Sequence, residues 1–206
     1  HADFIVFRKG LFFNFGSRQI TLKKSGTPLL FIENARASVN PLSLFALRLS
    51  VLFDGDISGG RMKGRVDLLH GSNRADITVG KAEIEDIPLF RVLGFAGSRG
   101  TFSGDMKMEN SSGEIRFDLT NAAFEPASFG GIILPLEMFY KARGAMTIKD
   151  NTVDIRSFAA EGDGIYARVK GKITGGRARL AVELMPERSF KEKNYIFSLL
   201  EQYKVS

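Results

Sequence analysis

The sequence predicts an all-β protein, built on one large antiparallel sheet that is either strongly curved into a half-barrel or closed over itself as a sandwich. Apolar and charged residues alternate with a period of two in several segments, and Gly- and Asn-containing turns separate these segments. The 206 residues are 44% hydrophobic and 25% charged, a globular composition that excludes wholesale disorder. Because no linker-like or low-complexity segment divides the chain, we expect a single domain over residues 1–206.

Alternation is clearest in residues 61–68, 101–109, 114–119, 165–173 and 177–184. In a strand, successive side chains point to opposite faces, so each of these segments has one apolar and one charged face. A parallel sheet covered on both sides would instead have continuous apolar runs. The pattern therefore favours antiparallel strands with one solvated face.

Weaker alternation predicts further strands, and together they give about ten to twelve strands joined mostly as hairpins. Gly59-Gly60, the Gly71–Asn73 segment, Asp150-Asn151 and Gly175-Gly176 mark turns between them. The additional strands are expected at residues 13–23, 30–39, 47–53, 75–84, 145–148 and 152–157.

Three segments break the period of two. Residues 86–94 begin with an acidic residue and a Pro and end with a Gly, which predicts a short helix at residues 88–93. Residues 40–44 predict a single helical turn. Residues 189–203 carry apolar side chains at roughly helical spacing, which predicts a C-terminal amphipathic helix.

Catalytic and metal-binding motifs are not supported by their surroundings. Gly162-x-Gly164-x-x-Ala167 matches a dinucleotide fingerprint, but a strand follows it where the chemistry requires a helix N-terminus. Asp54-x-Asp56-x-Ser58 imitates a calcium loop, but its twelfth position is Arg65 rather than Glu. The chain has no Cys and two His. We therefore expect no enzyme activity, no metal site and no cofactor.

Two late blocks carry a resemblance to a known family. They are Gly144-Ala-Met-Thr-Ile-Lys-Asp-Asn-Thr-Val-Asp-Ile and Glu161-Gly-Asp-Gly-Ile-Tyr-Ala-Arg-Val-Lys-Gly-Lys-Ile. These blocks, together with the Pro41-led turn, the Ile87-Pro88-Leu89 helix and the Gly-x-x-x-Gly strands, resemble the periplasmic part of type II secretion system protein N, in the AsmA-like group. The resemblance spans roughly residues 20–185.

The resemblance implies a periplasmic β domain of a bacterial inner-membrane protein with one N-terminal transmembrane helix. It also implies a half-barrel with an apolar concave face, linked to phospholipid transport, and a role in protein transport. The longest uncharged runs, residues 37–47 and 126–136, are far below the ~18 apolar residues that span a bilayer. His1-Ala2 stands where Met is expected, so we expect the anchor to precede residue 1.

The apolar side of the strands is the candidate ligand site, and we expect it to bind phospholipid or fatty acid through acyl chains. Large and adaptable side chains favour such a surface, as do the 18 Phe and absence of Trp. Two alternatives remain open: an ordinary closed core, and a non-catalytic module that docks other secretion-system or envelope proteins at its sheet edges. The candidate groove residues are Met62, Val66, Phe102, Met106, Met108, Ile115, Phe117, Val169 and Leu180.

The charged side of the strands is a second candidate surface, because the net charge is +6. We expect either a solvated face or contact with anionic lipid or a partner. Acidic residues interrupt the face and no aromatic stacking set shares it, which argues against nucleic acid. The candidate cations are Arg61, Lys63, Arg65, Arg168, Lys170 and Lys172.

Overall fold

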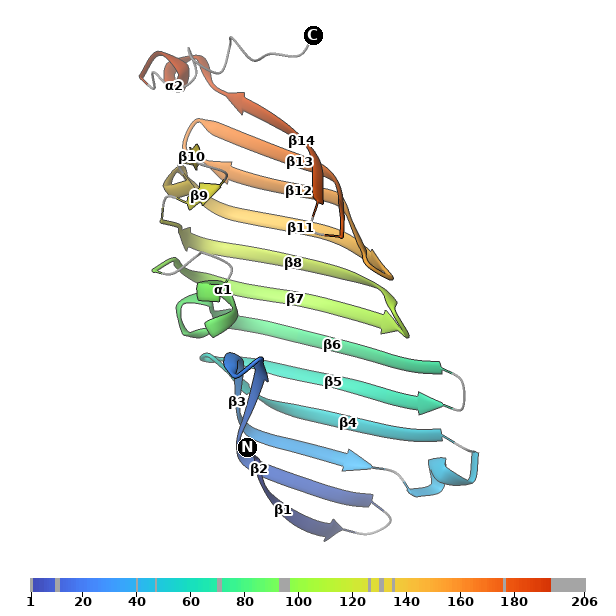
Figure 1. The fold of residues 1–206 in the computed structure, drawn as a ribbon. Coiled ribbons are helices and arrows are strands. Elements are labelled where there is room, and N and C mark those ends of the chain that lie inside the picture. Colours follow the sequence, from blue (N-terminus) through green and yellow to red (C-terminus); the bar gives the residue numbers. More distant parts are fainter. Residues whose placement is uncertain are drawn as a thin grey trace.

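The computed structural model describes residues 2–9, 12–39, 41–46, 48–69, 72–92, 97–125, 127–129, 132–134, 136–175 and 177–193. Their dominant element is a 12-stranded sheet in the order β1-β2-β3-β4-β5-β6-β7-β8-β11-β12-β13-β14. Every neighbouring pair is antiparallel, and the sheet is open and twisted rather than closed (Figure 1). The predicted all-β class with short helices is confirmed, in the open form and not as a sandwich.

The strands follow one another along the sheet in chain order, except for a small β9–β10 hairpin inserted between β8 and β11. Their bounds are β1 (Ala2–Lys9), β2 (Phe12–Lys24), β3 (Thr27–Val39), β4 (Arg48–Ile57), β5 (Gly60–Leu69), β6 (Ser72–Glu83), β7 (Arg99–Glu109), β8 (Ser112–Ala123), β9 (Ala127–Phe129), β10 (Ile132–Leu134), β11 (Phe139–Lys149), β12 (Thr152–Gly162), β13 (Ile165–Thr174) and β14 (Arg177–Pro186).

Short helical segments connect some of the strands. They are η1 (Pro41–Ala46), η2 (Ile84–Asp86), α1 (Pro88–Val92), η3 (Leu136–Met138) and α2 (Arg188–Lys193). The predicted turn at Pro41 and the helix after Pro88 are both present. The predicted C-terminal helix begins at the expected place as α2, and the part of it after residue 193 lies outside the described residues, as do His1 and His70.

The strand register brings the apolar side chains of successive strands to the same side of the sheet, which we call the apolar face. Val51 of β4 pairs with Val66, Ile77 with Met106, and Met106 with Ile115. Directly paired residues point to the same side, so the face continues from strand to strand. Its members from β4 to β14 include Val51, Phe53, Met62, Val66, Ile77, Val79, Phe102, Met106, Met108, Ile115, Phe117, Leu119, Met146, Ile148, Val153, Ile155, Phe158, Val169, Ile173, Leu180, Val182 and Leu184.

Most of the short elements gather at one end of the strands, which we call the capped end, whereas η1, between β3 and β4, lies at the other end (Figure 1). Figure 1 shows α1, the β9–β10 hairpin and α2 at the left ends of the strands, and the β2–β3 hairpin turning toward α1 there. Two clusters of buried residues lie beneath these elements: one contains Ile84, Leu119 and Ile165, and the other contains Ile57 and Met62. The protein core is therefore concentrated at one end of the apolar face.

Irregular pairings help to shape the capped end. Asn34, Lys81 and Asn121 have positive φ angles of 49°, 57° and 51°, in the left-handed region. Each lies at a register shift: between β3 and β4, between β6 and β7, and between β7 and β8. β-Bulges of this kind bend the strand and increase its local twist. They turn the strand ends toward the short elements that cover them.

Candidate functional site

All the candidate groove residues lie on the apolar face. Met62 pairs with Val79, Phe102 with Leu119, and Met108 with Gly113. On the later strands, Phe158 pairs with Val169, and Gly171 with Leu180. The structure thus places residues from β5, β7, β8, β13 and β14 on one face, with Met62 and Leu180 on well-separated strands of it.

On this face, phenylalanine rings lie over glycines and therefore stay close to the sheet. We call the resulting shallow surface of the apolar face the floor. Gly64 pairs with Phe53 and Gly144 pairs with Phe117, and in both cases a Cβ on the glycine would collide with the ring. A Cβ on Gly104 would lie 2.9 Å from Cζ of Phe102. The absence of a side chain at these glycines therefore lets each ring lie along the sheet rather than stand up from it.

The rings near the capped end form a continuous row. Phe90 of α1 meets Phe102 edge-on at a centroid distance of 5.9 Å. Phe102 stacks on Phe117 at 6.3 Å, and Phe117 meets Phe158 at 6.3 Å. These distances are in the range of favourable aromatic pairs. The row runs from α1 across β7 and β8 to β12.

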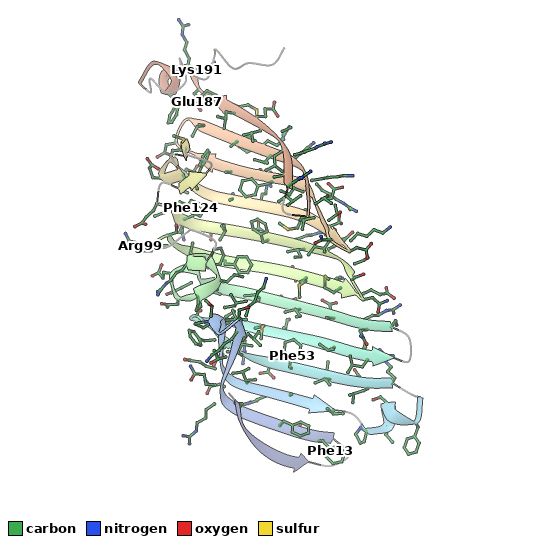
Figure 2. The ribbon with its side chains drawn as sticks, viewed as in Figure 1. Phe13, Phe53, Arg99, Phe124, Glu187 and Lys191 are labelled. Atoms are coloured by element: carbon green, nitrogen blue, oxygen red, sulfur yellow. The ribbon has the colours of Figure 1, made fainter. Side chains whose placement is uncertain are left out.

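Residues beneath the cover are more buried than those on uncovered strands and on the β14 edge. Met62, beneath the β2–β3 hairpin and α1, is 6% exposed, whereas Met106, Met108, Ile115 and Phe117 are half-buried. Leu180 on β14 is 43% exposed and Val182 is 60% exposed. Figure 2 shows Phe124 at the capped end and Phe13, which is 40% exposed, at the other end of its strand.

Polar turns border the end of the strands opposite to the cap. The backbone N–H of Asn110 donates to the carbonyl of Asn73 at 2.8 Å, and the Asn73 N–H donates to Oδ1 of Asn110. The Ser111 hydroxyl donates to Oδ1 of Asp150 at 2.9 Å. Because neighbouring turns are hydrogen-bonded to each other, this border is an ordered polar rim.

The opposite side of the sheet, the charged face, has acids and bases facing each other on adjacent strands. Arg61 pairs with Asp56, and Lys63 with Asp54. Arg65 pairs with Asp76 and donates to Asp67 at 2.9 Å. Such cross-strand pairs of opposite charge stabilise a sheet. The first three candidate cations therefore have acidic partners across the strands.

The candidate cations of β13 are only partly neutralised. Arg168 lies 3.6 Å from Glu183, and Lys172 lies 3.7 Å from Asp154. Lys170 pairs with Ala181, which carries no charge. Lys172 also pairs with Arg179 of β14, a like-charged neighbour. The excess positive charge of this face is therefore concentrated toward the β14 edge.

Asp67 is a buried charge of this face, in a hollow of about 900 Å³ whose lining includes many charged side chains. Arg48 Nη2 donates to one carboxylate oxygen at 2.7 Å and Arg65 Nε to the other at 2.9 Å. Burial raises the pKa of Asp67, but hydrogen bonds from Arg48, Ser50 and Arg65 outweigh it and hold the pKa well below its ordinary value. Asp67 is thus an ionised structural group.

The structure gives no metal centre and no membrane-spanning helix within the described ranges. No group of three or more His, Asp and Glu there is arranged to hold a metal ion. No described helix is long and apolar enough to cross a bilayer.

The candidate set did not include several residues that share the apolar face. Phe53, Met146, Ile155, Phe158 and Val182 occupy it as fully as the candidates do. Alternation within each segment could have found most of them, since the segments around them were predicted as strands. Phe158 is the exception, because the bulge between Ile155 and Phe158 shifts the alternation there.

In comparisons with known proteins, no family model, no curated protein and no solved structure matches the chain. The functional argument therefore depends on the open sheet and its apolar face.

Proposed function

We propose that the chain is a non-catalytic lipid-binding domain whose apolar face holds the acyl chains of a phospholipid. One observation carries the proposal. The apolar face continues without interruption from β4 to β14, while the described covering elements lie at one end of it. Large apolar surfaces are rarely left exposed to water, so an apolar ligand is expected to cover this face.

The chemistry of the floor fits a flexible chain. Rings that lie over glycines leave a low surface, and Met106, Met108 and Met146 can repack around different chains. Burial of each methylene contributes about 0.8 kcal/mol. Ten methylenes along this face would therefore offset a sizeable cost of association.

The polar border suits the other part of a phospholipid. Asn110, Ser111 and Asp150 hold an ordered rim where the strands end, opposite to the capped end. A phospholipid whose acyl chains lie along the floor would place its headgroup near water at this rim. The bound lipid would therefore lie with its headgroup at the rim and its acyl chains pointing toward the capped end.

The cellular setting that we propose is the periplasmic side of the bacterial inner membrane, in type II secretion or envelope lipid handling. Its support is the resemblance of the segments at Gly144 and Glu161 to type II secretion system protein N and the AsmA-like group. These segments form β11–β12 and β12–β13 of the sheet. An open sheet with an apolar face agrees with the half-barrel that this resemblance implies.

The experiment is native mass spectrometry of the purified chain, together with uptake of a labelled fatty acid. Wild type is expected to carry phospholipid. Met106→Glu places a charge on the half-buried floor and should abolish lipid binding while the melting temperature changes by only a few degrees.

Ala145→Glu is the matched control, because Ala145 lies on the charged face and pairs with Arg116. This variant should retain its lipid. Wild type that carries no lipid and takes up no fatty acid would end the proposal. Unfolding of Met106→Glu alone would mean that the floor is a closed core.

A second candidate function is docking of other secretion or envelope proteins at an open sheet edge. It is favoured by β1 and β14, each of which is paired on one side only within the described part of the chain. A delipidated sample that captures such a partner, and loses it when Pro is placed in an edge strand, would support this alternative.

A further inference from the structure

The β14 strand is an unusually open edge. Residues 177–185 are all exposed, and Leu180, Val182, Leu184 and Met185 are among the exposed large hydrophobic side chains. The strand pairs with β13 along its whole length without a register shift. Natural sheets usually protect an edge with charged side chains, bulges, an inward charge or Pro. β14 carries Arg177, Arg179 and Glu183, but it has no bulge and its single Pro is the last residue, Pro186.

The charges of β14 are incompletely matched within the chain. Glu183 is bridged by Arg168 at 3.6 Å. Arg179 faces Lys172, and it makes no ion pair with any residue that the structure describes. Like charges directly opposite each other destabilise a sheet. An acid on the open side of Arg179 would relieve this mismatch.

We propose that the β14 edge binds a second copy of this chain, strand to strand and antiparallel, about a two-fold axis at Ala181. In this register Arg179 of each copy faces Glu183 of the other, so that two opposite-charge pairs form across the edge. Leu180 faces Val182, and Ala178 faces Leu184. The interface is self-complementary, as two-fold symmetry requires.

Other registers fit less well. Registers that shift the pairing by one residue place apolar side chains opposite charged ones. Among the registers that keep the apolar faces together, pairing about Ala181 aligns the longest stretch of β14 that leaves out Pro186, which lacks an N–H to donate. Arg179 facing Arg179, or Glu183 facing Glu183, would be repulsive.

The symmetry has a consequence for the proposed ligand surface. A two-fold axis between antiparallel strands is perpendicular to the sheet, so both copies present their apolar faces on the same side. Leu180, Val182 and Leu184, which are all exposed members of the face, would then lie at the centre of a doubled sheet. This inference does not depend on lipid binding.

The first test is disulfide trapping, which the absence of Cys from the chain makes unambiguous. Ala181→Cys should form an intermolecular disulfide under mild oxidation, because directly paired Cα atoms in antiparallel strands are about 4.5–5.5 Å apart, within disulfide range. Ala145→Cys is the control: Ala145 also lies on the charged face, but on β11, which is paired on both sides. It should form no intermolecular disulfide, although it still associates through β14.

The second test uses charge reversal and sedimentation analysis of the dimer. Arg179→Glu relieves the repulsion from Lys172 within the chain but places two pairs of glutamates across the edge. It should weaken the dimer about tenfold, and at concentrations where the chain is monomeric it should leave the melting temperature unchanged or higher. Combining it with Glu183→Arg reverses both charges and should restore the dimer toward the wild-type dissociation constant.

A wild type that is monomeric at all accessible concentrations, with Ala181→Cys trapped no better than Ala145→Cys, would overturn the proposal. So would a dimer that Arg179→Glu leaves intact, because that dimer would use another surface, such as β1. Loss of lipid in Met106→Glu leaves these outcomes unaffected, so the failure of one proposal is distinguishable from the failure of the other.

Discussion

At the scale of single residues, the apolar face depends on pairs in which a glycine makes room for a ring. Gly64 with Phe53 and Gly144 with Phe117 are such pairs on neighbouring strands. A glycine inside a strand is intrinsically unfavourable, and an aromatic neighbour that lies over it recovers buried apolar contact. These glycines are therefore as important to the floor as the large side chains.

We expect Gly144→Ala to destabilise the fold by about 1–3 kcal/mol, because the new methyl group would displace the Phe117 ring from its place against Phe102 and Phe158. Denaturant unfolding would measure this. Gly80→Ala is the control, since a Cβ there meets no atom within 4 Å and should cost almost nothing. Equal stability of the two variants would show that the ring has room to move.

Asp67 makes stability depend on pH. Its pKa is held below the ordinary value, so its contribution is complete above about pH 5 and is lost as the pH falls through the folded-state pKa. Asp67→Asn should lower the free energy of unfolding by about 2 kcal/mol at pH 7 and by progressively less below pH 4. Unfolding curves from pH 7 to pH 2 test this, and a pH-independent difference would contradict it.

At the scale of elements, α1 connects the two buried clusters. Phe90 packs against both of them, and Ile87, just before the helix, is 3% exposed. A helix of five residues has little stability of its own, so it is held in place by these contacts. With its contacts to β3 and to both clusters, it forms part of the cover at the capped end.

We expect Phe90→Ala to lower the free energy of unfolding by about 2–3 kcal/mol, somewhat less than for a fully buried Phe. Leu89→Ala on the same helix is the control, because Leu89 is 39% exposed and its loss should cost no more than about 1 kcal/mol. Chemical denaturation compares the two. A similar cost for both would mean that α1 does not couple the clusters.

The elements also show what sequence alone could predict. Alternation located most of the main strands, because an antiparallel sheet with one solvated face has that period. It placed the end of β4 too early, since Gly55 interrupts the apolar series there. It did not predict β1, whose sequence ADFIVFRK does not alternate cleanly, or the three-residue strands β9 and β10.

The candidate site was predictable only in part. The residues of one face could be assigned strand by strand, but the bulges at Asn34, Lys81 and Asn121 and the position of the cover could not. These depend on contacts between segments that alternation does not encode. For the same reason, the acids opposite Arg61 and Lys63 were not assigned, because cross-strand pairing requires the register.

At the scale of the whole molecule, each main strand touches little except its neighbours, as in repeat proteins. Stability is then a sum of local terms and should vary along the sheet. We expect amide hydrogen exchange to be slowest in β7, β8, β11 and β12, which are paired on both sides and contribute to a buried cluster. It should be fastest in the edge strands β1 and β14.

The exchange is best measured at concentrations where the chain is monomeric, with Arg179→Glu as a second sample. If β14 were as protected as β8 under those conditions, another segment would have to cover its edge. If β14 of the wild type exchanges more slowly at high than at low concentration, the cause would be protection of its amides by dimer formation.

The chain-order topology also bears on how such a surface changes in length. Adding or removing a hairpin leaves every other pairing and the alternation of faces intact. Strands are about 4.8 Å apart, so each hairpin would extend or shorten the floor by about 10 Å without redesign of its neighbours. The number of hairpins therefore determines the width of the sheet and the length of the apolar face that it presents.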